Sequence, residues 1–540
     1  MIDLLSPGGA LDRAIPYYED RAEQRAMSTA VAQALDERRP LIVEAGTGTG
    51  KTLAYLIPAL QSGKRIVVST GTRALQDQIA RHDLPLLRTI LQRPFAAVVL
   101  KGVGNYVCRR RLAEAASRGG STDGNRGEIE ALLDWAEHTE TGDRAEVEWL
   151  AEGAPVWADV TTTPDARIGP RCPYFERCFV TQARRLADKA ELILVNHHLY
   201  FADRALRAAY PGARVLPEHD AVIFDEAHQL EDVATEHFGA RISTHKLGVL
   251  VRDAHLALSR MPRWTGRAAD DVIHAVERAG VALFSHVRGA LIGPSGEDRV
   301  PLPEGLFDHP ERQTAWFKLD TALEELARAA EAESEPPPQE LGDEPAEDQG
   351  ARASLAGLAR RARELRDDLA TIAEQRHKSH VYWGEARPGH TLLTASPIEV
   401  ADLVRRHIVA SGPTPIFTSA TLAAAGDFRY QRTRLGLDDA AELLVPSPFD
   451  YARQAMLYVP RDIPAPLEDG YAAAAAAGAL ELLALTQGRA FLLFTSHRAL
   501  RDAAARLTNL PYPRLVQGDA PRAALVDRFR STPNAVLLGT

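Results

Sequence analysis

A glycine-rich turn near the N-terminus holds the first residues whose types and spacing point to chemistry. It reads Glu44-Ala-Gly-Thr-Gly-Thr-Gly-Lys51-Thr52, and it lies between the apolar run Leu41-Ile-Val and an amphipathic stretch. The pattern G-x-x-x-x-G-K-[ST] binds phosphate when a strand precedes it and a helix follows it. Glycines let successive backbone N–H groups turn inward, and the helix adds its positive end. The turn therefore predicts a polyphosphate site.

Side-chain chemistry assigns expected roles within this loop. Lys51 would contact the β- and γ-phosphates, and the hydroxyl of Thr52 would help to hold Mg²⁺. A merely flexible glycine-rich loop would not explain the Lys-Thr pair together with the flanking periodicities. The candidate nucleotide-binding residues of the loop are Gly46, Thr47, Gly48, Thr49, Gly50, Lys51 and Thr52.

Two adjacent carboxylates form the second group. They stand in Ala221-Val-Ile-Phe-Asp225-Glu226-Ala227-His228. The apolar run predicts a strand buried in a parallel sheet, which delivers the carboxylates to its carboxyl end. Asp225 would hold Mg²⁺ through water, and Glu226 would orient or polarise the attacking water. An isolated Asp-Glu pair can simply cap a helix, but its pairing with the phosphate loop favours hydrolysis.

Other expected strands also end in polar residues. The stretch Arg65-Ile-Val-Val-Ser-Thr-Gly-Thr72 precedes a helix that starts at Arg73, and a plain α/β connection explains it as well as a phosphate contact does. A strand ending in Asn196-His197-His198 follows later in the chain. The hydroxyls of Thr418-Ser419-Ala420-Thr421 follow a further strand, and they are expected to reach the region of Glu226 or His228 and transmit nucleotide state.

All three cysteines fall within one segment of the chain, at Cys108, Cys172 and Cys178. Turn residues surround them, which indicates a metal or iron–sulfur site more than buried small hydrophobes. Thiolate clusters usually take four ligands, so a structural role stays open. Basic residues flank the cysteines, and they include Arg109, Arg110, Arg184 and Arg185.

Length and composition limit the possible classes of protein. A chain of 540 residues exceeds what one core supports, so several domains are expected. The net charge of −10 does not indicate a nucleic-acid binder, but an acidic, proline-bearing segment at 331–350 holds much of the net negative charge and leaves room for a basic groove elsewhere. We find neither an apolar run of about 18 residues nor a secretory signal, and three cysteines make no disulfide framework. These features predict a cytoplasmic protein without a membrane span.

The remaining stretches give a coarse order of elements. A helical hairpin is expected at 10–38, and its polar face includes Gln24, which either meets a nucleotide base or is simply exposed. Residues 245–330 are helix-rich, 331–350 predict a loop, and 351–375 predict a long charged helix. A last α/β unit supplies strands within 488–494, 515–517 and 535–539.

Taken together, these motifs resemble the DinG-like branch of the XPD-related superfamily 2 DNA helicases over nearly the whole chain. Residues 44–52 match motif I, 69–78 motif Ia and 225–228 the DEAH box, and 418–421 look like motif III. Segments 195–198, 447–450 and 494–497 are similar to other family segments. Gln24 falls where the family places an adenine-contacting glutamine.

The resemblance implies an α/β fold with two RecA-like parallel-sheet motor domains, a cysteine-bearing insert and a helical arch insert. The second motor domain is expected to be truncated at Thr540, before the family's motifs V and VI. The expected bounds are 1–107, 186–244 and 391–440 for the first motor domain, 108–185 for the iron–sulfur-like insert, 245–390 for the arch and 441–540 for the second motor domain.

One cofactor position departs from the family pattern. The family's cluster has four cysteines, and this chain has Arg167 where the second of them would stand. Arginine is always protonated and cannot ligate a metal. A [4Fe-4S] cluster with a non-cysteine fourth ligand, a labile cluster and no cluster at all remain open.

The resemblance implies an ATP-dependent DNA helicase that couples MgATP hydrolysis to 5′-to-3′ movement on single-stranded or forked DNA, in DNA repair or replication-conflict resolution. The expected catalytic residues are Lys51, Asp225, Glu226 and His228. The expected DNA contacts are Arg73, Arg109, Arg110, Arg184 and Arg185. We expect a monomer. The alternative is a nucleotide-responsive DNA-binding protein that does not unwind, because motifs V and VI are missing. A phosphate-loop kinase or transporter ATPase would not explain the DEAH box or the cysteines.

Overall fold

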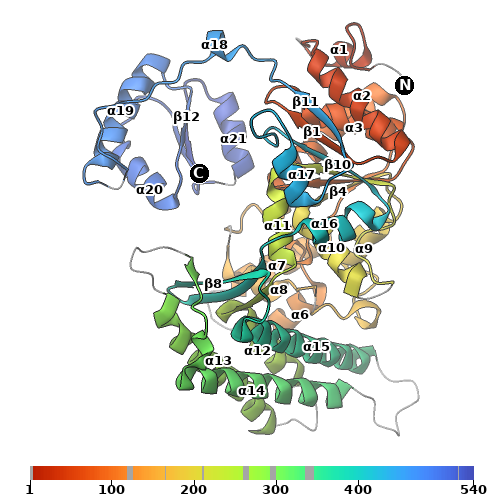
Figure 1. The fold of residues 1–540 in the computed structure, drawn as a ribbon, viewed down its shortest axis with the longest axis vertical. Coiled ribbons are helices and arrows are strands. Elements are labelled where there is room, and N and C mark those ends of the chain that lie inside the picture. The colour runs from red at the N-terminus through yellow and green to blue at the C-terminus, as the bar shows by residue number, and fades with distance from the viewer. Residues whose placement is uncertain are drawn as a thin grey trace. The chain divides into compact units, whose positions relative to one another are not determined.

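The computed structural model describes residues 4–16, 18–117, 126–151, 153–164, 166–209, 212–258, 267–291, 299–334, 346–466, 468–520 and 522–540. The chain divides into two compact units (Figure 1). The first unit comprises Met1–Arg144 and Pro155–Phe449, and the second comprises Ala145–Ala154 and Asp450–Thr540.

A seven-stranded parallel sheet forms the centre of the first unit, in the order β11-β1-β10-β5-β2-β4-β3. Its strands read as short apolar runs because both faces of the sheet are covered. The predicted strands at the phosphate loop, the DEAH box and the hydroxyl motif are confirmed. The strands are β1 Leu41–Ala45, β2 Ile66–Thr70, β3 Ala97–Val99, β4 Leu192–Asn196, β5 Ala221–Asp225, β10 Thr414–Ser419 and β11 Ala441–Val445.

Alternate residues of these strands enter two different cores. Leu41 and Val43 pack in one hydrophobic cluster, while Ile42 between them packs in the other, on the opposite face of the sheet. Helices cover each face, as expected for a doubly wound sheet. They are α1 Ala10–Ala14, α2 Ala22–Glu37, α3 Lys51–Gln61, α4 Arg73–Gln78, α5 Leu84–Leu91, α10 His197–Ala209, α11 Leu230–His237, α16 Ala401–His407 and α17 Arg429–Leu435.

The cysteine-bearing insert lies between β3 and β4 and is mainly helical. Its helices are α6 Arg109–Ser117, α7 Arg126–His138, α8 Pro155–Val160 and α9 Phe179–Ala187. Lys101, at the entry to the insert, is 7% exposed and pairs with Asp143 at 2.7 Å and Asp77 at 3.2 Å. Residues 119–124, where glycine, serine and aspartate predict a loop, lie outside the described residues.

In the described part of the segment expected to form the arch, four long helices and a small antiparallel sheet pack around one hydrophobic cluster. Residues 331–334 end α14 and 346–350 begin α15, so helix replaces both ends of the loop predicted at 331–350; the part from 335 to 345 is not described. The sheet runs β6-β9-β8-β7. The elements are β6 Ala240–Ser243, α12 Thr244–Leu258, α13 Arg267–Arg288, β7 Val300–Pro301, α14 Pro310–Ser334, α15 Ala346–Glu374, β8 His380–Arg387 and β9 His390–Pro397.

The sheets join segments that are far apart in the sequence, and the expected domain bounds stay a prediction. Strand β9 pairs with β6, from the segment expected in the first motor domain, and with β8, from the segment expected in the arch. Strand β11 pairs with β1, although residues from 441 onward were expected in the second motor domain. An apolar run predicts a strand but does not name its partner, because pairing depends on distant residues.

The second unit holds a three-stranded parallel sheet in the order β12-β14-β13. The three strands predicted near the C-terminal end are confirmed. Its elements are α18 Tyr451–Gln454, α19 Tyr471–Thr486, β12 Ala490–Leu493, α20 His497–Arg506, β13 Arg514–Val516, α21 Arg522–Ser531 and β14 Val536–Gly539. Within the described ranges, no helix combines the length and apolar character needed to cross a membrane.

Candidate active site

The motifs that sequence reasoning selected follow the carboxyl ends of neighbouring strands. The phosphate loop follows β1, residues 418–421 span the end of β10, the DEAH box begins at the last residue of β5 and residues 71–72 follow β2. These strands are adjacent and parallel, so the segments meet at one edge of the sheet. Ligands of open α/β sheets bind at this edge.

The phosphate loop closes on itself and on the helix that follows. Thr49 is fully buried, and its hydroxyl donates to the carbonyl of Gly46 at 2.9 Å. Gly50 has a φ of 75° and precedes α3, whose first residues are Lys51 and Thr52. The first N–H groups of a helix have no partner within the helix, so this end can bind an anion.

A short segment before the end of the first unit packs on the same loop. A β-carbon at Gly46 would lie 2.5 Å from the backbone nitrogen of Ser447, and one at Gly48 would lie 2.3 Å from the Phe449 ring. The Ser447 hydroxyl also donates to the Thr47 carbonyl at 2.7 Å. Only glycine permits such close approach, which explains both positions.

Helix α2 contacts the loop from another side. Gln24 is 4% exposed, and its amide donates to the Gly50 carbonyl at 3.0 Å. Arg21, which sequence reasoning missed, donates to the Gly48 carbonyl at 2.5 Å. Gln24 therefore supports the loop in this structure, and its adenine contact stays a prediction.

Asp225 is buried at the end of β5 and accepts a hydrogen bond from the Tyr55 hydroxyl at 2.9 Å. Burial and the neighbouring charge of Glu226 raise the pKa of Asp225 to about 6, against the lowering effects of Tyr55 and Lys51. Tyr55 is fully buried and also bonds the side chain of Thr52. It therefore connects the two side chains expected at the Mg²⁺ site.

Glu226 has a left-handed backbone with φ 62°, which is uncommon for a residue other than glycine. This conformation turns the chain sharply after β5. Oε2 of Glu226 accepts from the Ser419 hydroxyl at 2.9 Å, and Nδ1 of His228 lies 2.9 Å from the same hydroxyl. The expected link between the hydroxyl motif and Glu226 or His228 is therefore present.

Lys51 completes the cluster from the side of the phosphate loop. Its Nζ lies 3.9 Å from Oε1 of Glu226, and both side chains are largely shielded from water. The edge thus brings together a cation and helix N–H groups suited to phosphates, a buried carboxylate suited to a hydrated metal ion, and a second carboxylate beside them. Such a set can hydrolyse a nucleoside triphosphate.

Glu44 is a second connection that sequence reasoning did not assign. Its Oε2 accepts from the backbone N–H groups of Leu422 at 2.5 Å and Ala423 at 2.6 Å. Glu44 lies in β1, directly before the phosphate loop, so its two hydrogen bonds fix the turn after β10 to β1. A charged residue in an otherwise apolar strand was the signal that could have found it.

Comparisons with known proteins agree with this geometry. The family model described as DEAD/DEAH box helicase matches residues 24–106, and the DEAD_2 model matches 166–247. The chain is 36% identical to the ATP-dependent DNA helicase YoaA of Escherichia coli, covering 100% of this chain and 81% of that protein. The chain belongs to the DinG-like family of ATP-dependent DNA helicases.

Another member of the DinG-like family shows similar agreement. The ATP-dependent helicase DinG of Mycobacterium tuberculosis is 30% identical, covering 96% of this chain and 78% of that protein. A solved structure of an XPD helicase aligns with a TM-score of 0.52 at 16% identity, covering 96% of this chain and 80% of that one. That likeness supports the α/β helicase fold.

The arginines expected to contact DNA differ in the exposure of their side chains and in their partners within the protein. The Arg109 side chain is 11% exposed and bound internally, which argues against a DNA role. Arg110 pairs with Glu114 at 2.8 Å. Burial, as the largest cause, lowers the pKa of Arg184 to about 10. Arg185 is 51% exposed and pairs with Glu176 at 2.7 Å. Arg73 begins α4, and its side chain lies outside the description.

The three cysteines of the DinG-like chain line one small cavity of about 30 Å³, and all are free thiols. Arg110 and Arg167 line the cavity with them. Burial raises the pKa of Cys178, but hydrogen bonds from Thr181 and the charge of Arg167 outweigh it and lower that pKa overall. Across the described ranges, no group of three or more His, Cys, Asp or Glu side chains has a geometry that could hold a metal ion.

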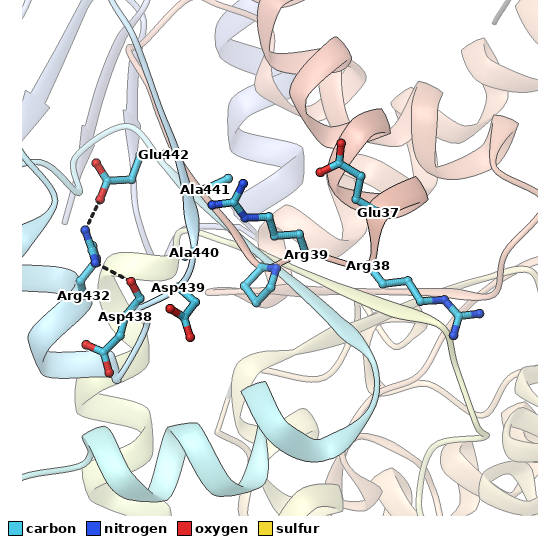
Figure 2. A pocket seen from close by; sticks show the side chains of 10 residues that line it. Glu37, Arg38, Arg39, Arg432, Asp438, Asp439, Ala440, Ala441 and Glu442 are labelled. Carbon is cyan, nitrogen blue, oxygen red and sulfur yellow. Dashed lines mark hydrogen bonds and ion pairs between the residues drawn. The ribbon is translucent and has the colours of Figure 1, made fainter.

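A larger surface hollow of about 880 Å³ lies at the other edge of the sheet (Figure 2). Residues before β1, in α17 and around the start of β11 line it, including Arg39, Arg432 and Glu442. Arg432 donates to Glu442 at 2.8 Å. The phosphate loop follows the opposite end of β1, so this hollow is separate from the candidate nucleotide site.

Proposed function

We propose that this chain couples MgATP hydrolysis to strand separation on DNA, moving 5′ to 3′ along single-stranded or forked substrates. The observation that carries the proposal is the hydrogen bond between Ser419 and Glu226, which connects the expected water-activating carboxylate to the hydroxyl motif. A change in nucleotide state at Glu226 can therefore reach another strand of the sheet. A motor needs such a connection, and a passive nucleotide site does not.

Each side chain at the sheet edge has a proposed role. Lys51 and the N-terminal N–H groups of α3 bind the β- and γ-phosphates. Thr52 and Asp225 would hold Mg²⁺, which neutralises phosphate charge when bound. Glu226 orients the attacking water, and His228 positions the Ser419 hydroxyl that holds Glu226.

We propose that DNA binds through phosphate contacts that carry no sequence information. Arg73, Arg110, Arg184 and Arg185 stay candidate contacts, and we set Arg109 aside because its guanidinium is bound internally. We further propose a cytoplasmic monomer that acts in DNA repair or replication-conflict resolution. The four-thiolate iron–sulfur group is left out of this function, because Arg167 cannot ligate iron.

The decisive test replaces Lys51 with alanine. We expect DNA-stimulated ATP hydrolysis to fall by on the order of 10²-fold or more, because the lysine stabilises charge on the transferred phosphate. Lys318→Ala, an exposed lysine of the arch, is the matched control. Unchanged turnover in Lys51→Ala would refute the assignment of the nucleotide site.

Strand displacement on forked DNA tests the remaining step. We expect the wild-type chain to separate strands only when ATP can be hydrolysed. We also expect separation only when the single-stranded tail has the polarity that 5′-to-3′ movement requires. Nucleotide-dependent DNA binding without displacement at saturating ATP would support the alternative, a DNA-binding protein without unwinding activity.

A further inference from the structure

The cysteine cavity does not offer the donor set of a four-thiolate cluster. The whole sequence has three cysteines, and Arg167 lines the same cavity with a cationic side chain. Iron–sulfur clusters are held by four ligands that donate electron pairs, and a guanidinium has none to donate. A cluster also ties distant segments together, so some other contact must do this in its place.

Arg109 makes such ties from the residue directly after Cys108. Its guanidinium donates to Glu137 at 2.7 Å and to the Ala136 carbonyl at 2.8 Å, at the end of α7. Its Nε donates to the Arg177 carbonyl at 3.1 Å, directly before Cys178. Three segments of the insert therefore meet on one side chain.

The Arg109 guanidinium also stacks over the ring of Phe179, 4.6 Å from its centroid. Phe179 is 3% exposed and begins α9. A β-carbon at Gly142 would lie 2.4 Å from this ring, so the loop after α7 packs directly on it. The arginine thus joins α6, α7, the loop before Cys178 and α9 by hydrogen bonds and ring contact.

Arg167 makes the corresponding tie at the position of the missing thiolate. Its Nη2 donates to the Thr181 hydroxyl at 2.7 Å, in the first turn of α9. The Thr181 side chain in turn bonds Cys178. The loop that carries Arg167 is therefore fixed to α9 without a metal ligand.

A buried ion-pair network attaches the insert to the arch. Arg111 pairs with Asp253 at 2.6 Å, and Arg361 pairs with the same carboxylate at 2.7 Å. All three side chains are at most 11% exposed. A buried carboxylate between two arginines has its charge and lone pairs satisfied, so the network fixes α6 against α12 and α15.

We propose that this insert folds and functions without an iron–sulfur cluster, because Arg109 and Arg167 make the cross-links between segments that cluster thiolates would make. The three cysteines are then structural thiols beside a cation. The proposal concerns the insert alone and does not depend on the ATP site, so it can fail while the proposed function stands.

The first experiment measures metal content and its effect on stability in the full-length chain. The protein is purified without oxygen, and iron and acid-labile sulfide are assayed. We expect far less than one iron per chain, and a thermal midpoint that neither an iron chelator nor reconstitution with iron and sulfide shifts. About four iron and four sulfide per chain, with a midpoint that falls on chelation, would overturn the proposal.

The second experiment tests the cross-link itself. In Arg109→Ala, we expect amide hydrogens of α7 and α9 to exchange at least about tenfold faster, because several charge-assisted bonds are lost. Arg126→Ala is the matched control, since Arg126 lies on the same insert, is 72% exposed and makes one surface ion pair. Equal exchange in the two variants would overturn the role of Arg109. ATP hydrolysis in the absence of DNA serves as the check that the remaining fold is intact.

Discussion

The hydroxyl of Tyr55 donates to Oδ2 of Asp225 at 2.9 Å, across 170 positions of sequence. One residue belongs to the helix after the phosphate loop and the other ends the strand of the DEAH box. The bond fixes the orientation of the carboxylate expected to hold hydrated Mg²⁺. Because partners behind a metal ligand tune its affinity, this contact is expected to affect metal dependence more than stability.

Tyr55→Phe tests this expectation while keeping the buried ring. The Mg²⁺ concentration needed for half-maximal ATP hydrolysis should rise by roughly 10- to 100-fold, because Asp225 loses its hydrogen-bond donor. Tyr200→Phe is the control. Tyr200 is also fully buried, but its hydroxyl lies 3.2 Å from Nε2 of His219 and not at Asp225. Magnesium titrations that coincide for Tyr55→Phe and the wild type would contradict the role.

Ser419→Ala should separate nucleotide binding from turnover. Glu226 loses its hydroxyl partner, so we expect kcat of DNA-stimulated hydrolysis to fall by about tenfold while the KM for ATP changes little. Ser411→Ala is the control, because the Ser411 hydroxyl donates to the nearby Ile408 carbonyl, in the connection between α16 and β10. A raised KM with unchanged kcat would show that Ser419 serves binding instead.

Glu44→Ala is expected to loosen the turn after β10. The N–H groups of Leu422 and Ala423 lose their shared acceptor, which costs about 1 to 3 kcal/mol of unfolding free energy. Glu44→Gln keeps an acceptor of the same shape and should cost less. Hydrogen exchange at these two amides measures the effect, and protection equal to that of the wild type in Glu44→Ala would rule it out.

The raised pKa of Asp83 is expected to make the stability of the fold depend on pH. Burial raises the pKa of Asp83 from 3.8 to about 6, despite the opposing charge of His82. The folded chain therefore binds more protons than the unfolded chain between these values. The stability that this group contributes is fully present below pH 3.8 and is lost as the pH rises through about 6.

Asp83→Asn removes this titration. We expect its thermal midpoint, relative to that of the wild type, to be higher at pH 8 than at pH 5, because only the wild type carries a charge at this partly buried position at pH 8. Melting curves of both proteins at the two pH values measure the difference. A difference between the proteins that stays constant with pH would disprove the prediction.

The local elements of the nucleotide site were predictable because each leaves a short-range pattern. The β1 run, the glycines and the Lys51-Thr52 pair occupy one stretch, and the apolar residues before Asp225 mark a buried strand. Parallel strands align their carboxyl ends, so the loop and the carboxylates were expected at one edge. The hydroxyl of Ser419 was expected near Glu226 for the same reason.

Contacts between distant residues had no such pattern. Tyr55 looks like an ordinary helix residue, and Arg109 looks like part of a basic patch, until the fold brings Asp225 and Phe179 to them. The partners of β9 and β11 were also beyond reach, because strand pairing depends on which apolar faces meet.

The sequence by itself determined the chemistry of this protein, since motif spacing on single strands and turns specifies the phosphate loop, the DEAH box and the family. Only the tertiary structure decided which side chains support that chemistry and which arginines are bound inside the insert. The physical reason is that hydrogen bonds and burial depend on neighbours in space. Those neighbours come from other segments of the chain, 68 positions away for Arg109 and the Arg177 carbonyl and 170 positions away for Tyr55 and Asp225.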